Sequence, residues 1–221
     1  MPRIACLHTA ASNIAVFDDA LRGLHPDGPG HPAAVLTHEV RADLLAAAEQ
    51  AGGPTDEILR HTADVLFGLC DGADAVLLTC STLGPAVDSV LGARVPVLRV
   101  DAALAAQAVG GGGRVVALCA VETTMEPTRK VFEAARGAIG AEVEVRLIPG
   151  AWAAFRAGDH AAYLMRVARA ADDAARGGAR VALAQASMAG AAALADSAPL
   201  TSPAAGLAAA IAAARAGVVG R

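Results

Sequence analysis

The chain has 221 residues, a formal net charge of −4 and 55% hydrophobic residues, much of that fraction being Ala. The acidic balance and the 3% aromatic content argue against a nucleic-acid-binding surface, which needs basic clusters and stacking rings. The apolar runs are short and broken by Arg, Asp or Gly, so no membrane-spanning segment is expected. The first residues lack the pattern of a signal peptide, and the Ala, Arg and Gly content is typical of a GC-rich genome. We therefore expect a cytoplasmic bacterial protein.

Short apolar runs alternate with helical patterns along the first half of the chain. This half is expected to contain strands over residues 3–9, 33–37, 72–78 and 95–100, and helices over 14–24, 41–50, 55–70, 86–91 and 101–109. Residues 25–32 are expected to form a loop. His38 and Glu39 are expected to follow the end of the second strand, and residues 110–113 to form a Gly-rich break.

The second half shows the same alternation. It is expected to contain strands over residues 114–120, 142–148 and 179–185, a polar turn over 122–124, a short link over 200–203, and helices over 126–139, 151–158, 160–176, 188–196 and 204–216. Strands that alternate with helices throughout predict an α/β fold with parallel sheets.

Cys80 lies where the third expected strand ends and a helix begins. The helix is indicated by Pro85 at an early position, with Ser81 or Thr82 as its N-cap. The carboxyl edge of a parallel sheet is where α/β proteins bind ligands. A thiol at a helix N-terminus is biased toward thiolate, and the free amides there can hold a carboxylate. The alternative is a buried, inert cysteine at a strand end.

The two halves resemble each other. Residues 3–8 lie over 114–119 at an offset of 111, and residues 72–81 lie over 178–187 at an offset of 106, which pairs Cys80 with Ala186. We therefore expect two similar α/β domains that face each other across a ligand-binding cleft. The first domain is expected to comprise residues 1–100 plus 204–221, and the second residues 101–203.

The chain resembles the aspartate/glutamate/hydantoin racemase superfamily over nearly its whole length. The resemblance is carried by Thr79-Cys80-Ser81-Thr82, Gln185-Ala186-Ser187-Met188, His8-Thr9, Glu122-Thr123-Thr124 and Glu126-Pro127-Thr128. It implies two pseudo-symmetric Rossmann-like (flavodoxin-like) domains with parallel sheets and an active site between them. It also implies that the last helix returns to the first domain and that no metal, pyridoxal phosphate or other cofactor is used. In such racemases one thiolate removes the α-proton and an opposite thiol returns a proton.

The sequence departs from this pattern at Ala186, where the second cysteine is expected. Ser187 next to it is too weak an acid and base to replace a thiol. Three functions remain open. The first is an isomerase or racemase-like enzyme that acts through Cys80 on a small amino acid or other carboxylic acid. The second is a one-cysteine decarboxylase of a malonate-like acid, although arylmalonate decarboxylases carry their cysteine in the other half. The third is a non-catalytic carboxylate-binding protein.

The candidate catalytic residues are Cys80 and His8. His8 either pairs with Cys80, acts as a second base, or is a hydrogen-bonded structural histidine. Cys119 occupies the repeat position of His8 and is either a displaced thiol or a buried one; Glu122 and His38 are weaker candidates. The four cysteines, Cys6, Cys70, Cys80 and Cys119, have no metal-ligand spacing and are expected to be free thiols, with no metal site. The candidate substrate-binding residues are Thr9, Ser81, Thr82, Thr123, Thr124, Ser187 and Met188. The apolar helices suggest a homodimer or higher homo-oligomer.

Overall fold

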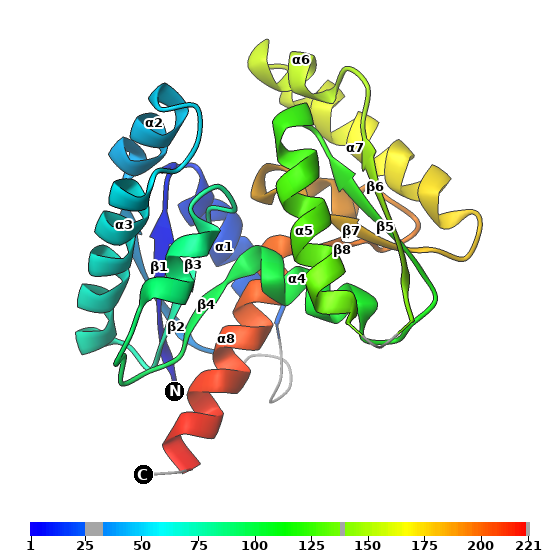
Figure 1. Ribbon diagram of the computed structural model, residues 1–221. Helices are drawn as coiled ribbons and strands as arrows, with labels where there is room; N and C mark the ends of the chain where they lie inside the picture. The colour runs from blue at the N-terminus through cyan, green and yellow to red at the C-terminus, as the bar shows by residue number, and fades with distance from the viewer. Residues whose placement is uncertain (25–32, 138–139, 220–221) are drawn as a thin grey trace. The chain divides into compact units, whose positions relative to one another are not determined.

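The computed structural model describes residues 1–24, 33–137 and 140–219, so the expected loop over residues 25–32 lies outside the described residues. The chain divides into two compact units (Figure 1). The first comprises Met1–Val100 with Gly206–Arg221, and the second comprises Asp101–Ala205. The chain passes from the first unit to the second at the start of one helix and returns within another, and each unit has its own sheet.

The first unit is built on a four-stranded parallel sheet of order β2-β1-β3-β4, with β1 and β3 in the centre. Parallel neighbours need crossover segments, which α1, α2 and α3 supply. The strands are β1 (Arg3–His8), β2 (Val35–Val40), β3 (Ala75–Leu78) and β4 (Val97–Arg99). The helices are α1 (Asn13–Arg22), α2 (Ala42–Gln50), α3 (Asp56–Leu69) and two short 3-10 turns, η1 (Cys70–Gly72) and η2 (Gly84–Ser89).

One face of this sheet packs against α2 and α3 (Figure 1). α3 starts at Thr55, whose side chain accepts a hydrogen bond from the Ile58 amide and so occupies one free donor of the first turn. Side chains alternate along a strand, so every second residue of β1 and β3 reaches this face. Its core contains Ala5 and Leu7 of β1, Val76 and Leu78 of β3, and Leu44 and Leu66 of the helices.

The opposite face is covered by α1 and by α8 (Ser202–Val219). Phe17 of α1 is fully buried and stands edge-on to His8, with ring centroids 5.1 Å apart. α8 approaches the sheet so closely that Gly206 has no space for a side chain. A Cβ there would lie 2.7 Å from Cγ1 of Val100 and 3.3 Å from Cδ2 of Leu77.

The second unit repeats this topology, with a parallel sheet of order β6-β5-β7-β8. α6 and α7 cover one face and α4 and α5 the other, each with its own apolar core. The strands are β5 (Arg114–Cys119), β6 (Glu142–Leu147), β7 (Arg180–Leu183) and β8 (Leu200–Thr201). The helices are α4 (Val100–Val109), α5 (Met125–Arg136), α6 (Ala151–Arg156), α7 (His160–Ala175) and the 3-10 turns η3 (Glu122–Thr124) and η4 (Ala186–Ala193).

The structure confirms the α/β fold with parallel sheets and corrects four local expectations. His38 and Glu39 lie inside β2 and not after it, and the expected link over 200–203 forms β8 and the start of α8. The expected helices over 86–91 and 188–196 are the 3-10 turns η2 and η4. No helix among the described residues is both long and apolar enough to cross a membrane.

The strand pairing also corrects one of the two repeat offsets. Ile4 lies opposite Ala75 in the first sheet. At the offset of 111, the equivalent of Ile4 is Val115, which lies opposite Arg180. Ala75 therefore corresponds to Arg180, and the offset of the third strand is 105 instead of 106.

The buried faces agree with the offset of 105. Val76 belongs to the α2/α3 core and Val181 to the equivalent α6/α7 core, whereas Ala182 points to the opposite face. A slip of one residue would exchange the two faces of a strand. The position equivalent to Cys80 is therefore Gln185, and the expected match with Ala186 is wrong by one residue.

The tight approach of α8 to the first sheet can be tested with two glycine substitutions. We expect Gly206→Ala to lower the free energy of unfolding by about 1–3 kcal/mol, because the stiff Val100 side chain cannot move aside without strain. Gly68→Ala is the matched control in α3, where a Cβ meets nothing within 4 Å. It should raise the free energy of unfolding by roughly 0.5–1 kcal/mol through helix propensity. Urea titration of both variants measures the difference, and a stabilised Gly206→Ala would contradict this packing.

Candidate functional site

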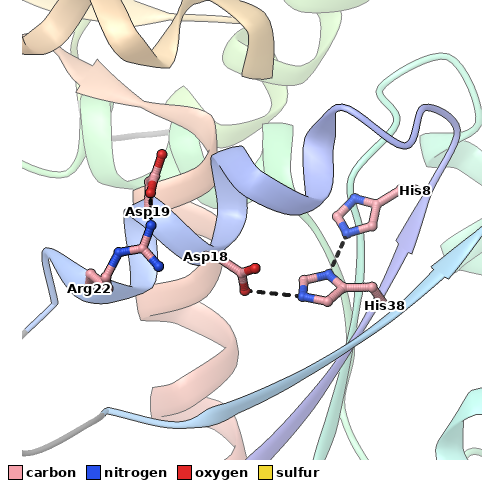
Figure 2. Close-up of polar contacts among 5 residues, drawn as sticks. All are labelled: His8, Asp18, Asp19, Arg22 and His38. Carbon is pink, nitrogen blue, oxygen red and sulfur yellow. Dashed lines mark hydrogen bonds and ion pairs between the residues drawn. The ribbon is translucent and has the colours of Figure 1, made fainter.

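His8, the last residue of β1, belongs to a chain of hydrogen bonds on the α1 face of the first sheet. Its ring is fully buried. Nδ1 of His8 lies 2.9 Å from Oγ1 of Thr79, and Nε2 lies 2.9 Å from Nδ1 of His38 in β2. Nε2 of His38 lies 3.2 Å from a carboxylate oxygen of Asp18 in α1 (Figure 2). The chain of contacts thus joins two strands, the residue that follows a third, and the helix that covers them.

The Thr79 hydroxyl has two acceptors within reach, the Leu7 carbonyl oxygen at 3.0 Å and Nδ1 of His8 at 2.9 Å. When its single proton goes to Leu7, Thr79 accepts from a proton on Nδ1 of His8, and Nε2 of the neutral His8 ring is an acceptor. When that proton goes to His8, the neutral ring carries its own proton on Nε2 and donates it to Nδ1 of His38. In both cases Nε2 of His38 can donate to the carboxylate of Asp18.

Burial keeps His8 neutral. Loss of solvation, with the adjacent His38 as a second cause, lowers the pKa of His8 from 6.5 to about 4, and Asp18 opposes this only in part. Cys6 lies on the same face two residues earlier in β1, and burial raises the pKa of its thiol to about 12. A neutral imidazole and a protonated thiol are therefore the resting states of these two groups.

Three of these side chains could hold a metal ion. The Sγ of Cys6 and one ring nitrogen each of His8 and His38 lie within 4.8 Å of one another. The cysteines have no metal-ligand spacing along the chain, but the parallel pairing of β1 and β2 places Cys6 opposite His38. The pattern Cys-x-His in a strand, which puts both side chains on one face, was the signal that could have indicated this cluster.

Cys80 lies on the other face of the same sheet. It is only 9% exposed and packs with Leu7, Leu78 and Leu83 in the α2/α3 core. Among the described residues no hydrogen bond to its thiol is found. The expected pairing of His8 with Cys80 is therefore replaced by the bonds of His8 to Thr79 and His38.

The segment after Cys80 also differs from the expected helix start. η2 begins at Gly84, its N-cap is Leu83, and no side chain caps it, so Ser81 and Thr82 are not the N-cap. Both are half-buried in the turn that leaves the strand. Pro85 does occupy the first turn, as expected. A 3-10 turn of six residues offers Cys80 little of the dipole that a long α-helix would provide.

Arg99, at the end of β4, was not identified from the sequence as a site residue. Its guanidinium lies directly against Gly84 and fills the space that a side chain would need there. The end of β4 and the turn after Cys80 belong to the carboxyl edge of one sheet, where Thr9 also lies, largely buried. This edge therefore holds a thiol, several hydroxyls and a guanidinium.

In the second unit, the position equivalent to Cys80 carries an amide that is engaged in hydrogen bonds. Oε1 of Gln185 accepts from the Ala120 amide at 2.7 Å, and its Nε2 lies 3.5 Å from Oγ1 of Thr124. Thr124 donates to the Val121 carbonyl at 2.6 Å. Gln185 thus fixes the turn after β5 and cannot carry a proton as a thiol does.

The other candidate residues of the second unit lie at or just after the carboxyl ends of its strands β5 and β7. The Ser187 hydroxyl lies 2.9 Å from the Tyr163 hydroxyl, and burial raises the pKa of Tyr163. Thr123 is exposed, and Met188 is fully buried in the α6/α7 core. Cys119 is fully buried, its thiol contacts Oγ1 of Thr128 at 3.5 Å, and burial raises its pKa.

The chain was compared with known proteins at the level of sequence and of structure. No protein-family model matches the sequence, and no curated protein sequence matches it. An aspartate racemase from Picrophilus torridus superposes with a TM-score of 0.68 at 12% identity, covering 97% of this chain and 95% of the racemase. An allantoin racemase from Pseudomonas fluorescens gives 0.68 at 16% identity, covering 97% and 92% of the two chains. An arylmalonate decarboxylase gives 0.57 at 16% identity, covering 96% and 92%.

These likenesses define the class of fold. The chain has the α/β fold shared by aspartate, allantoin and glutamate racemases and by arylmalonate decarboxylase. The expected resemblance to the aspartate/glutamate/hydantoin racemase superfamily is thereby confirmed at the level of the fold.

The depressed pKa of His8 predicts a loss of stability in acid. Between pH 6.5 and about 4 the unfolded chain binds a proton at His8 that the folded chain does not, so stability falls as the pH is lowered through this window. The contribution of His8 is at most about 3 kcal/mol. Urea titrations of chelator-treated wild type and His8→Gln across the window should show a shallower pH dependence in the variant. His61→Gln, at an exposed histidine of α3, is the matched control; an unchanged slope in His8→Gln would refute the assignment.

Proposed function

We propose that the protein is a cofactor-independent enzyme of the racemase and isomerase type. It acts on the carbon next to the carboxylate of a small amino acid or other carboxylic acid, with the thiol of Cys80 as the proton carrier. The observation that carries the proposal is the place of Cys80 at the carboxyl edge of a central strand of this fold. Cys6 and Cys119 are fully buried, and Cys70 lies at the opposite edge, before β3 begins.

The chemistry starts from the thiolate of Cys80. It removes the proton from the α-carbon, and the electron pair left on carbon is delocalised into the carboxylate as an enediolate. The guanidinium of Arg99 and the hydroxyls of Ser81 and Thr82 are suited to hold that carboxylate. Return of a proton to the opposite face of the carbon gives the enantiomer, whereas return to another carbon gives an isomer.

A lyase is the second candidate, and the residue at position 185 favours it. Racemisation by two thiols needs a second acid, and neither the amide of Gln185 nor the doubly hydrogen-bonded His8 is suited to that role. Decarboxylation needs only one. The bond from the α-carbon to one carboxylate breaks, carbon dioxide leaves, and the electron pair remains as an enediolate. The Cys80 thiol then gives its proton to the carbon, and water restores it.

Exchange of the α-proton with solvent tests the role of Cys80. In deuterated water, small amino and hydroxy acids that shift the thermal midpoint of the protein should gain deuterium at the α-carbon, as followed by NMR. Cys80→Ser should slow this exchange by about a thousandfold, because a hydroxyl is a far poorer base than a thiolate. Cys70→Ser is the matched control and should keep the wild-type rate. Equal rates in wild type and Cys80→Ser would count against the proposal.

The two candidate reactions differ in their products. Substituted malonates should release carbon dioxide if the enzyme is a lyase, and the product should carry one solvent deuteron in a single configuration. An isomerase should instead leave the carbon count of its substrate unchanged. Binding of such acids without either reaction would indicate the non-catalytic alternative.

The strand register makes a further prediction about the second thiol. Gln185→Cys places a thiol at the position equivalent to Cys80, so it should introduce or raise racemisation of ligands that already undergo exchange. Ala186→Cys, one residue later on the opposite side of the strand exit, should raise it less, because a shift of one residue turns the side chain away. Polarimetry or chiral chromatography measures both rates. A more active Ala186→Cys would contradict the register-based equivalence.

A further inference from the structure

Three donor atoms converge on the α1 face of the first sheet, away from the face on which Cys80 packs. Cys6 and His8 are two residues apart on β1, so their side chains point to the same side, and His38 is the direct neighbour of Cys6 on β2. Their Sγ and ring nitrogen atoms lie within 4.8 Å of one another. Thiolate and imidazole are the ligands that zinc and similar divalent cations prefer.

The outer ring nitrogens of both histidines have neighbours that can accept a proton. With its own proton on the Leu7 carbonyl, the Thr79 hydroxyl accepts from Nδ1 of His8. The Asp18 carboxylate accepts from Nε2 of His38. In this arrangement of the neutral rings, each of the two facing nitrogens, which are 2.9 Å apart, has a lone pair available for a cation.

We propose that a divalent cation of the zinc type binds here, with Cys6, His8 and His38 as its ligands. In the metal-free protein a hydrogen bond between the two rings occupies the same place. Two zinc–nitrogen bonds of about 2.1 Å in tetrahedral geometry place the nitrogens roughly 3.4 Å apart, so the rings need to separate by only about half an ångström. Water would complete the four ligands.

The surroundings match those of metal-binding histidines. Such histidines usually donate their second ring proton to a carboxylate or another acceptor, which orients the ring. Here Asp18 has that role for His38 (Figure 2), and Thr79 has it for His8. Cys6 and His8 are fully buried, so solvent reaches the ion only from the side of His38. The side chains of His38 and Asp18 are 15% and 42% exposed and provide the route from solvent. The ligands come from two strands of one sheet, which holds them rigidly.

Binding can be measured with the full-length protein after treatment with a chelator and desalting. Titration with Zn²⁺ alone should give one site per chain and raise the thermal midpoint. Each zinc bound should release the proton of the Cys6 thiol, because thiolate is the form that binds the metal. Co²⁺ in place of zinc should produce a thiolate-to-cobalt charge-transfer band in the near ultraviolet, which identifies a sulfur ligand.

Variants distinguish this site from binding elsewhere. Cys6→Ser should abolish the charge-transfer band and, like His38→Gln, weaken zinc binding by about a hundredfold or more. Asp18→Asn, which removes only the group that orients His38, should weaken it about tenfold. Cys70→Ser is the matched control and should retain both the band and the affinity. Circular dichroism verifies that each variant is folded.

Two results would overturn the proposal. One is a chelator-treated wild-type protein that binds neither Zn²⁺ nor Co²⁺ at millimolar concentration. The other is a cobalt spectrum without the thiolate band, or one that Cys6→Ser leaves unchanged. Because these readouts do not involve turnover, they are independent of the outcome for Cys80.

Discussion

The hydrogen bonds of His8 determine the chemistry of the α1 face of the first sheet. Its two ring nitrogens contact the Thr79 hydroxyl and His38, and His38 contacts Asp18. The Thr79 hydroxyl has a second acceptor in the Leu7 carbonyl, so the position of its single proton decides which nitrogen of His8 donates. Each partner comes from a different part of the chain, so the bonds also hold together β1, β2, the end of β3 and α1.

Much of the fold could be predicted from the sequence because the apolar runs are short, bounded and separated by helical patterns. The strand ends were predicted within a few residues wherever a full crossover follows. The predictions failed where local patterns are ambiguous. A two-residue strand such as β8 has no periodicity, and the 3-10 turns η2 and η4 have the composition of α-helices. The repeat offset slipped because Ala-rich strands match almost equally well in adjacent registers, and only the pairing with β1 and β5 separates them.

The strand-end positions of the two candidate catalytic residues were predicted from the sequence, whereas the side chains that they contact were not. Both Cys80 and His8 lie at strand ends, as expected, yet they occupy opposite faces of the sheet. Alternation along the strand places Thr79, and not Cys80, beside His8. His38 was ranked as a weaker site candidate because it was expected beyond the end of its strand. The pairing of β2 with β1 instead places it next to Cys6. Such contacts depend on how strands from distant parts of the chain are aligned with one another. A local sequence pattern does not determine that alignment.

The return of α8 to the first unit has a consequence for biosynthesis. Residues 101–205 form a contiguous segment that contains every strand of the second sheet and both of its cores, so this unit needs no later part of the chain to complete its packing. The first sheet, although made earliest, lacks the helix that covers Leu77 and Val100 until residue 206 and those after it have emerged. The first unit therefore completes its packing only after the whole second unit has been synthesised, and until then it exposes apolar surface around Leu77 and Val100.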